Sequence, residues 1–419
     1  MIQQIIDKRL IELSDKIVLS LDQNFKKIDK IAQLNQDKVL AAFCNNKISD
    51  AHLSGTTGYG YDDYGRDAIE NIYSEIFGGE DAIVRHSIVS GTHALAISLF
   101  GVLRPGDTML SVTSKPYDTL EEVIGIKDSC GSLKEFGVNY EQIDFKNNDI
   151  NYAEIKNKVN KDVKVVFIQR SKGYLNRPSL SVYEIGKISS FVKALNKDVV
   201  VIVDNCYGEF VEEYEPLSFG ADLIVGSLIK NPGGGIAKTG GYIVGNKNLI
   251  EKCATRLSCP GIGKECGASL NQNSSILQGV FLAPHTTAQA LKTAVFASAL
   301  FELFGFSVNP KKDDERNDII QIIELKSREK VLDFCAGIQK GSPVNSFATP
   351  IGAPMPGYES EVVMAAGTFV QGASIELSAD APLKEPYNVF FQGGLTFESG
   401  KTGILFAANE LLKNGYISL

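Results

Sequence analysis

The stretch that decides the fold is Val199-Val200-Val201-Ile202-Val203-Asp204-Asn205-Cys206-Tyr207. Its β-branched apolar residues predict a buried strand at Val199–Val203, and an acidic residue follows that strand directly. A second strand, predicted at Asp222–Val225, comes next in the chain and is followed by Ser227 and Lys230. Strands that are apolar along their whole length are typical of a parallel sheet with helices on both faces.

Further short apolar runs alternate with helical patterns on either side of this stretch. The additional predicted strands are Thr108–Val112, Val163–Ile168 and Gly241–Val244, and the predicted helices are Asp67–Phe77, Ala94–Leu103, Leu120–Ile126 and Tyr183–Leu195. This alternation predicts an α/β fold with a mostly parallel central sheet. In such a sheet, ligands bind beyond the carboxyl ends of the strands, where we expect Asp204 and Lys230.

The length of 419 residues predicts two or three domains. Apolar residues recur at near-helical spacing over residues 1–45, so we expect an N-terminal helical arm at residues 1–50. A large domain is predicted at 51–285, and a smaller C-terminal domain with an α+β pattern at 286–419. A long Ala-rich helix is predicted from His285 to Leu303, and we expect it to link the two domains.

The composition excludes several classes of protein. The chain has 42 Lys and Arg against 50 Asp and Glu, a net charge of −8, whereas a protein that binds nucleic-acid phosphates needs a basic face. No apolar run reaches the roughly 18 residues of a membrane span, and the first residues lack the apolar run of a signal peptide. The seven scattered cysteines form no metal-binding or disulfide pattern. We therefore expect a cytoplasmic protein with no metal site and no nucleic-acid or membrane partner.

An Asp and a Lys at the ends of neighbouring strands suit pyridoxal 5′-phosphate. Lys230 is placed to form a Schiff base with the cofactor aldehyde, and the carboxylate of Asp204 is placed to keep the pyridine nitrogen protonated. Upstream, Ser90-Gly91-Thr92 opens a predicted helix, and its backbone N–H groups suit a phosphate. Tyr117 is the candidate aromatic side chain over the cofactor ring.

These residues resemble, in type and order, the fold-type-I pyridoxal-phosphate enzymes of the cystathionine and methionine lyase group. The whole chain is similar to one branch of that group, the methionine γ-lyase-like proteins often labelled aluminium-resistance proteins or cystathionine β-lyases. The motifs that carry this closer resemblance are Gly58-Tyr59-Gly60-Tyr61-Asp62-Asp63, the segment from Gln278 to His285, the segment from Ile375 to Asp380, and Gln392-Gly393-Gly394-Leu395-Thr396.

The resemblance implies a role for each matching residue. Lys230 is then the Schiff-base lysine and proton shuttle, Asp204 pairs with the ring nitrogen, and Tyr117 stacks on the ring as a second catalytic residue. The residues that then hold the phosphate are Ser90, Gly91, Thr92 and Ser227. Tyr59 or Tyr61 reaches the phosphate of a neighbouring subunit, which implies a homo-oligomer, a dimer or a homotetramer, with shared active sites.

The sequence departs from the better-known lyases at two places. Ile229 stands where a phosphate-binding Thr usually precedes the lysine, and Gln392 stands near the position of the Arg that binds the substrate carboxylate. We therefore expect the carboxylate to be recognised by other cations, with Arg177, Lys384 and Arg66 as candidates.

The resemblance implies a carbon–sulfur lyase that acts on a sulfur-containing amino acid. The expected reaction runs through the external aldimine of the substrate and a Cα carbanion, and the sequence leaves β- and γ-elimination open. Two alternatives stay open as well. The first is an aminotransferase or γ-replacement transferase with the same cofactor, and the second is a pyridoxal-phosphate-binding protein without turnover that acts in stress tolerance.

Overall fold

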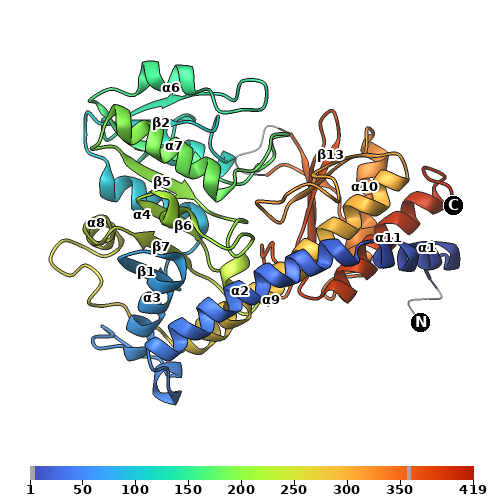
Figure 1. Cartoon of the computed structure of the whole chain (residues 1–419), viewed down its shortest axis with the longest axis horizontal. Helices are drawn as coiled ribbons and strands as arrows, with labels where there is room; N and C mark the ends of the chain where they lie inside the picture. Colours follow the sequence, from blue (N-terminus) through green and yellow to red (C-terminus); the bar gives the residue numbers. More distant parts are fainter. Residues whose placement is uncertain (1–4, 356–359) are drawn as a thin grey trace. The chain divides into compact units, whose positions relative to one another are not determined.

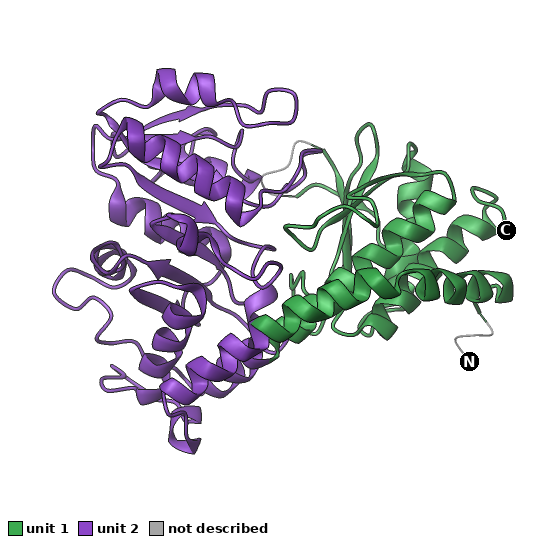
Figure 2. Cartoon of the chain, in the orientation of Figure 1, with its two compact units in different colours: residues 1–34, 282–419 green, residues 35–281 purple. Residues whose placement is uncertain are grey.

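The computed structural model describes residues 5–355 and 360–419, and these form two compact units (Figure 2). Unit 2 comprises residues 35–281, and unit 1 joins residues 1–34 to residues 282–419. The first four residues of the predicted arm, and residues 356–359 of the predicted small domain, lie outside the described residues.

Unit 2 is built around a seven-stranded sheet with the order β1-β7-β6-β5-β4-β2-β3 (Figure 1). Its strands are β1 (Asp81–Arg85), β2 (Thr108–Ser111), β3 (Asn139–Gln142), β4 (Val163–Gln169), β5 (Val200–Asp204), β6 (Leu223–Ser227) and β7 (Gly241–Gly245). The strands β2 to β6 run parallel to one another, whereas β7 is antiparallel to both β6 and β1. The predicted α/β fold with a mostly parallel sheet is therefore confirmed, although β1 and β3 were not predicted.

Helices follow the strands of unit 2 in the predicted alternation. They are α3 (Tyr64–Phe77), α4 (Gly91–Val102), α5 (Glu121–Ile124), α6 (Tyr152–Lys158), α7 (Val182–Leu195) and α8 (Lys247–Leu257), with short 3-10 turns η2 (Asp50–Leu53), η3 (Asp118–Leu120), η4 (Pro216–Phe219) and η5 (Asn231–Gly233). Apolar residues of α4 and α8 form one buried cluster with alternate residues of the central strands, such as Phe167, Ile202 and Val225. This burial fixes the strand ends that carry the candidate site.

Unit 1 contains a second sheet, with the order β10-β11-β12-β13-β9-β8 and antiparallel pairing throughout. Its elements are β8 (Ser307–Asn309), β9 (Gln321–Glu324), α10 (Arg328–Lys340), β10 (Gly352–Ala353), β11 (Val362–Ala365), β12 (Ser378–Pro382), β13 (Asn388–Gln392) and α11 (Phe397–Lys413). One apolar cluster holds this sheet, α10, α11 and the N-terminal helix α1 (Lys8–Ser20) together. The predicted α+β pattern of the C-terminal part is confirmed.

Two long helices contain the points at which the chain passes between the units. The helix α2 (Asp22–Asn45) follows α1 after a break at Leu21, so the predicted helical pattern of residues 1–45 belongs to two helices. The helix α9 (Asn273–Leu303) begins well before the predicted start at His285 and contains Pro284. Residues 1–34 belong to the same compact unit as the C-terminal residues. The division into domains at 1–50, 51–285 and 286–419 stays a prediction.

None of the described helices is both long enough and apolar enough to cross a membrane.

Candidate active site

The candidate site lies at the carboxyl ends of β5 and β6, which are parallel neighbours. Asp204 is the last residue of β5, and Ser227 is the last residue of β6. Lys230 follows in the turn after β6, and its backbone N–H bonds to the carbonyl of Ser227 at 3.3 Å. As predicted, the acid and the lysine thus follow adjacent strands of the sheet.

The amine of Lys230 is in contact with Tyr207. Lys230 Nζ donates a hydrogen bond to Tyr207 Oη at 2.6 Å, and the same nitrogen lies 4.2 Å from the centre of the tyrosine ring. Tyr207 belongs to the loop after β5 and has a positive φ of 72°. Tyr207 carries no role predicted from the sequence, although it ends the stretch Val199–Tyr207 that decides the fold.

Asp204 is a buried carboxyl group at the strand end. Burial raises its pKa, while the backbone N–H of Cys206, 3.1 Å from Oδ1, and the positive charge of Lys230 act in the opposite direction. A charged carboxylate in such a place is stabilised by a cation beside it. A protonated pyridine nitrogen is a cation of this kind, so Asp204 fits its predicted role.

The start of α4 lies against the end of β6. A Cβ added to Gly91 would lie 3.4 Å from Cβ of Ser227 and 3.5 Å from Sγ of Cys206, so the two backbones approach closely. Ser90 caps the helix by accepting the backbone N–H of His93 at 3.0 Å. Ser227 Oγ accepts the N–H of Ile229 at 3.3 Å. Helix N-termini favour anions, so Ser90, Gly91, Thr92 and Ser227 together suit a phosphate group.

Tyr117 lies in the loop after β2, directly before η3, and is half-buried. Its ring centre lies 5.8 Å from that of Tyr174. Gly173 lies beside it, and a Cβ at that glycine would come 3.6 Å from Cδ2 of Tyr117. Thr119, two residues further on, bonds to Thr92 in α4 at 2.6 Å between the two hydroxyl oxygens. The loop that carries Tyr117 therefore lies next to the predicted phosphate site.

Tyr59 and Tyr61 project from a loop that is firmly held at its backbone. Their rings are 5.8 Å apart, and their exposed fractions are 76% and 57%. The carbonyl of Tyr59 accepts the N–H of Gly267 at 2.8 Å, and Arg66 Nη1 donates to the carbonyl of Gly60 at 2.6 Å. Two exposed aromatic side chains on a rigid loop suit a contact with a second molecule, which stays a prediction.

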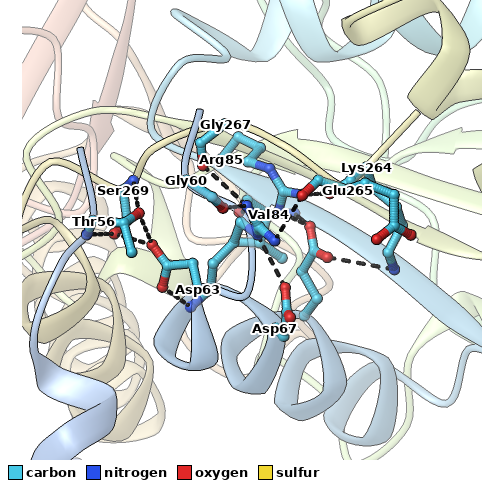
Figure 3. A network of polar contacts seen from close by, with 12 residues as sticks. Thr56, Gly60, Asp63, Asp67, Val84, Arg85, Lys264, Glu265, Gly267 and Ser269 are labelled. Atoms are coloured by element: carbon cyan, nitrogen blue, oxygen red, sulfur yellow. Dashed lines mark hydrogen bonds and ion pairs between the residues drawn. The ribbon is translucent and has the colours of Figure 1, made fainter. Parts of the chain in front are cut away.

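Figure 3 shows the polar network that holds this loop. Although burial alone raises the pKa of Asp63, hydrogen bonds from Ser269, Thr56 and the backbone N–H of Arg66 lower it to about 2. In the same network Arg85 pairs with the buried Glu70, and burial lowers the pKa of Arg85 to about 9. The loop is therefore fixed by charged groups that face inward.

Comparison with known proteins decides the family. Residues 10–412 match the family described as methionine gamma-lyase. The chain belongs to this family.

The chain is similar to several proteins across almost its full length. It is 53% identical to YnbB of Bacillus subtilis over 94% of each chain. It is 49% identical to a solved structure described as a carbon–sulfur lyase involved in aluminium resistance from Clostridium novyi, which covers 97% of this chain and 96% of that one with a TM-score of 0.93. A pyridoxal-5′-phosphate-dependent protein, YhfS from Escherichia coli, is 17% identical over 92% of this chain and 97% of its own, with a TM-score of 0.63. This last likeness concerns the fold alone and confirms the predicted fold-type-I architecture.

The candidate carboxylate-binding residues of this methionine gamma-lyase family member lie in different places. The guanidinium of Arg177 is buried and donates to the backbone carbonyls of Gln169 at 2.9 Å and Ser171 at 2.5 Å. Arg66 donates to loop carbonyls, as described above. Lys384 is exposed after β12, and Gln392 ends β13, where its Nε2 donates to Asp380 at 3.1 Å. Lys384 and Gln392 belong to unit 1, and their proposed contact with substrate stays a prediction.

Sequence reasoning also missed the group that supports the loop after β5. Arg170 follows β4 and is fully buried, with Nη1 2.7 Å from Asn205 Oδ1 and Nη2 2.7 Å from Glu212 Oε1. Gly208 lies directly on it, since an added Cβ would come 2.5 Å from Cδ of Arg170. The signal in the sequence was a charged residue at the end of an apolar strand, the same signal that singled out Asp204.

In the described parts of the chain, no group of three or more His, Cys, Asp and Glu side chains is arranged to hold a metal ion.

Proposed function

We propose that this protein is a pyridoxal-phosphate-dependent carbon–sulfur lyase that eliminates a thiol from a sulfur-containing amino acid. The observation that carries the proposal is the placement of Asp204 and Lys230 at adjacent strand ends beside the N-terminus of α4. Membership of the methionine gamma-lyase family supports it. So does the full-length similarity to the Clostridium novyi protein described as a carbon–sulfur lyase.

The residues present fit the cofactor. When bound, pyridoxal phosphate supplies an electron-accepting ring that makes the Cα–H bond of an amino acid acidic. The carboxylate of Asp204 would pair with its ring nitrogen, Lys230 would bind its aldehyde carbon, and Tyr117 would stack on the ring. Its phosphate would be held by Ser90, Gly91, Thr92 and Ser227.

Lys230 is the proton-transfer group in this proposal. As a neutral amine it accepts the Cα proton at Nζ, and as an ammonium it can return a proton to the departing or remaining fragment. Its contact with Tyr207 holds Nζ at a defined place. Tyr117 acts beside it as the aromatic wall of the site and a second catalytic side chain.

The remaining parts of the proposal concern recognition and assembly. The substrate carboxylate is bound by Arg177, Lys384 or Gln392, and Tyr59 or Tyr61 completes the phosphate site of a neighbouring subunit in a homo-oligomer. The exposed pair of tyrosines on a held loop supports this arrangement. The free cysteines of the described residues support work in a reducing cytoplasm.

A panel of thioether and thiol amino acids tests the reaction. With pyridoxal phosphate bound, we expect ammonia together with pyruvate from β-elimination or 2-oxobutanoate from γ-elimination. A Lys230→Ala variant should lose this activity. Transfer of amino groups to added 2-oxo acids without ammonia would establish an aminotransferase instead, and binding without any turnover would establish a non-catalytic protein.

Borohydride reduction tests the lysine. Reduction of the cofactor-loaded protein should attach the pyridoxyl group to the peptide that contains Lys230. Lys238 lies on the same glycine-rich segment and is exposed, so it serves as the internal comparison. A label on Lys238 in place of Lys230 would contradict the proposed site.

A further inference from the structure

The backbone at Tyr207 has an unusual conformation. Its φ of 72° lies in the left-handed region, which bulky side chains rarely adopt. The neighbouring contacts hold it there: the N–H of Cys206 bonds to Asp204 Oδ1 at 3.1 Å, and the N–H of Gly208 bonds to the carbonyl of Asn205 at 3.0 Å. A strained backbone that is held by its surroundings often marks a functional side chain.

This conformation brings the phenol of Tyr207 to the reactive amine. Lys230 Nζ lies 2.6 Å from Tyr207 Oη and 4.2 Å from the ring centre. A phenol hydroxyl both donates and accepts, so it can accept a hydrogen bond from an ammonium and donate one to a neutral amine. Tyr207 can therefore keep the same contact while Lys230 changes its protonation state.

We infer that Tyr207 is a further catalytic residue, whose hydroxyl orients the amine of Lys230 for proton transfer and for bonding to the cofactor. The resemblance to known lyases assigns no role to this residue. The inference rests on the proposed function, because it takes Lys230 as the reactive lysine. A purely structural role is distinguishable, since phenylalanine would fill the same volume and lack only the hydroxyl.

The test measures how fast the cofactor-free protein captures pyridoxal phosphate. In that step the neutral Nζ of Lys230 adds to the aldehyde carbon to form a C=N bond, and the aldehyde oxygen leaves as water together with the two hydrogens of the amine. The step is followed by the visible absorbance of the bound cofactor and needs no substrate turnover. We expect Tyr207→Phe to lower the capture rate about tenfold at saturating cofactor, the effect of losing one orienting hydrogen bond.

A matched control removes a hydroxyl elsewhere. Tyr183 lies on the surface of α7 with an exposed fraction of 61%, and Tyr183→Phe should capture the cofactor at the wild-type rate. A wild-type rate in Tyr207→Phe would overturn the inference. Reduction with borohydride after capture checks that the bond forms at Lys230 in every variant.

A second variant keeps the test decisive if Tyr207→Phe folds poorly. Asparagine tolerates the left-handed backbone and has no phenol, so Tyr207→Asn should fold and still capture slowly. Capture at the wild-type rate by this variant would also overturn the inference. If the wild-type protein forms no bond at Lys230, the proposed function itself fails. If the wild-type protein captures the cofactor normally and the Tyr207 variants capture it equally fast, only the inference about Tyr207 fails.

Discussion

Glu209 is a fully buried residue two positions after Tyr207. Tyr242 donates to its Oε1 at 2.8 Å, and Asn231, the neighbour of Lys230, donates to its backbone carbonyl at 2.9 Å. Burial raises the pKa of Glu209 to about 8; the Tyr242 hydrogen bond and the Arg170 charge oppose the rise, and the charge of Glu215 adds to it. Glu209 is therefore mostly protonated at neutral pH and links β7 to the loops that carry Tyr207 and Lys230.

Replacing Glu209 should change how stability depends on pH. In the unfolded chain this carboxyl group has its ordinary pKa of 4.5, so it loses its proton at a lower pH than in the folded protein. Its contribution to the free energy of unfolding therefore falls as the pH rises from about 5 to about 8. Glu209→Gln keeps the shape and cannot ionise, so this variant should lose less stability over that range. Urea unfolding of wild type and Glu209→Gln at about pH 5 and about pH 8 measures how much stability each loses between them. The exposed Glu251 on α8 provides the control, and a Glu209→Gln curve that follows wild type would contradict the raised pKa.

Asp204 should show opposite effects on stability and on activity. Because burial raises its pKa, its charged form costs free energy in the cofactor-free protein. Asp204→Asn keeps an oxygen for the N–H of Cys206, so we expect the free energy of unfolding at neutral pH to rise by about 1 kcal/mol. Turnover should fall by roughly 10²-fold or more, because the amide cannot hold the ring nitrogen protonated. A variant that is both less stable and fully active would contradict this assignment.

At the residue scale, the sequence predicted the groups that follow apolar strands. Asp204 was found because it comes directly after a strand pattern and Lys230 because it follows the next strand closely, and the structure places the two strands side by side. Tyr207 and Glu209 were missed because their importance lies in contacts across loops, and Arg170 was missed although it follows an apolar strand as Asp204 does. Such contacts depend on the backbone path, which no local pattern specifies.

The helix α4 contributes through its first turn. Ser90 accepts the N–H of His93, and loss of an N-cap side chain costs about 1 kcal/mol. We expect Ser90→Ala to lower the free energy of unfolding by about this amount and also to weaken cofactor binding. Thermal or urea unfolding gives the first effect, and titration of the cofactor-free protein with pyridoxal phosphate gives the second.

The helix α7 offers the matched control for this prediction. Ser181 caps it in the same way, accepting the N–H of Glu184 at 3.2 Å, and Glu184 bonds back to the N–H of Ser181 at 2.8 Å. Ser181→Ala should therefore cost similar stability and leave the affinity for pyridoxal phosphate unchanged. Equal loss of affinity in both variants would show that Ser90 acts through stability alone.

At the element scale, the strands that escaped prediction lack the apolar pattern. The strand β3 reads Asn-Tyr-Glu-Gln and lies at the edge of the sheet, with its residues partly exposed. The strand β1 has only three apolar residues between charged ones. The antiparallel direction of β7 agrees with its connection: the segment between β6 and β7 contains the short turn η5 and no α-helix, whereas parallel strands are usually joined by a crossover helix.

For the whole molecule, the fold does not specify the reaction. The chain shares its fold with a protein of 17% identity, and folds of this kind host many chemistries. The residues proposed to hold the cofactor all belong to unit 2, whereas the candidates for the substrate carboxylate come from both units. The cofactor-binding residues therefore do not specify which substrate is used. The products of the reaction are needed to distinguish β-elimination from γ-elimination.

The proposed sharing of active sites between subunits can be tested by mixing two impaired variants. Lys230→Ala should lower activity by about 10³-fold or more, and a Tyr59→Phe, Tyr61→Phe double variant should bind the cofactor about tenfold more weakly. If the tyrosines serve the partner, a hybrid oligomer contains a site with an intact Lys230 from one chain and intact tyrosines from the other. Activity at limiting cofactor should then partly return on mixing.

Lys230→Ala mixed with Asp204→Asn is the control, because both residues lie at adjacent strand ends of one chain and no hybrid restores the pair. Native mass spectrometry must show hybrids in both mixtures, and hybrids without recovered activity would mean that the tyrosines act within their own chain or only in packing.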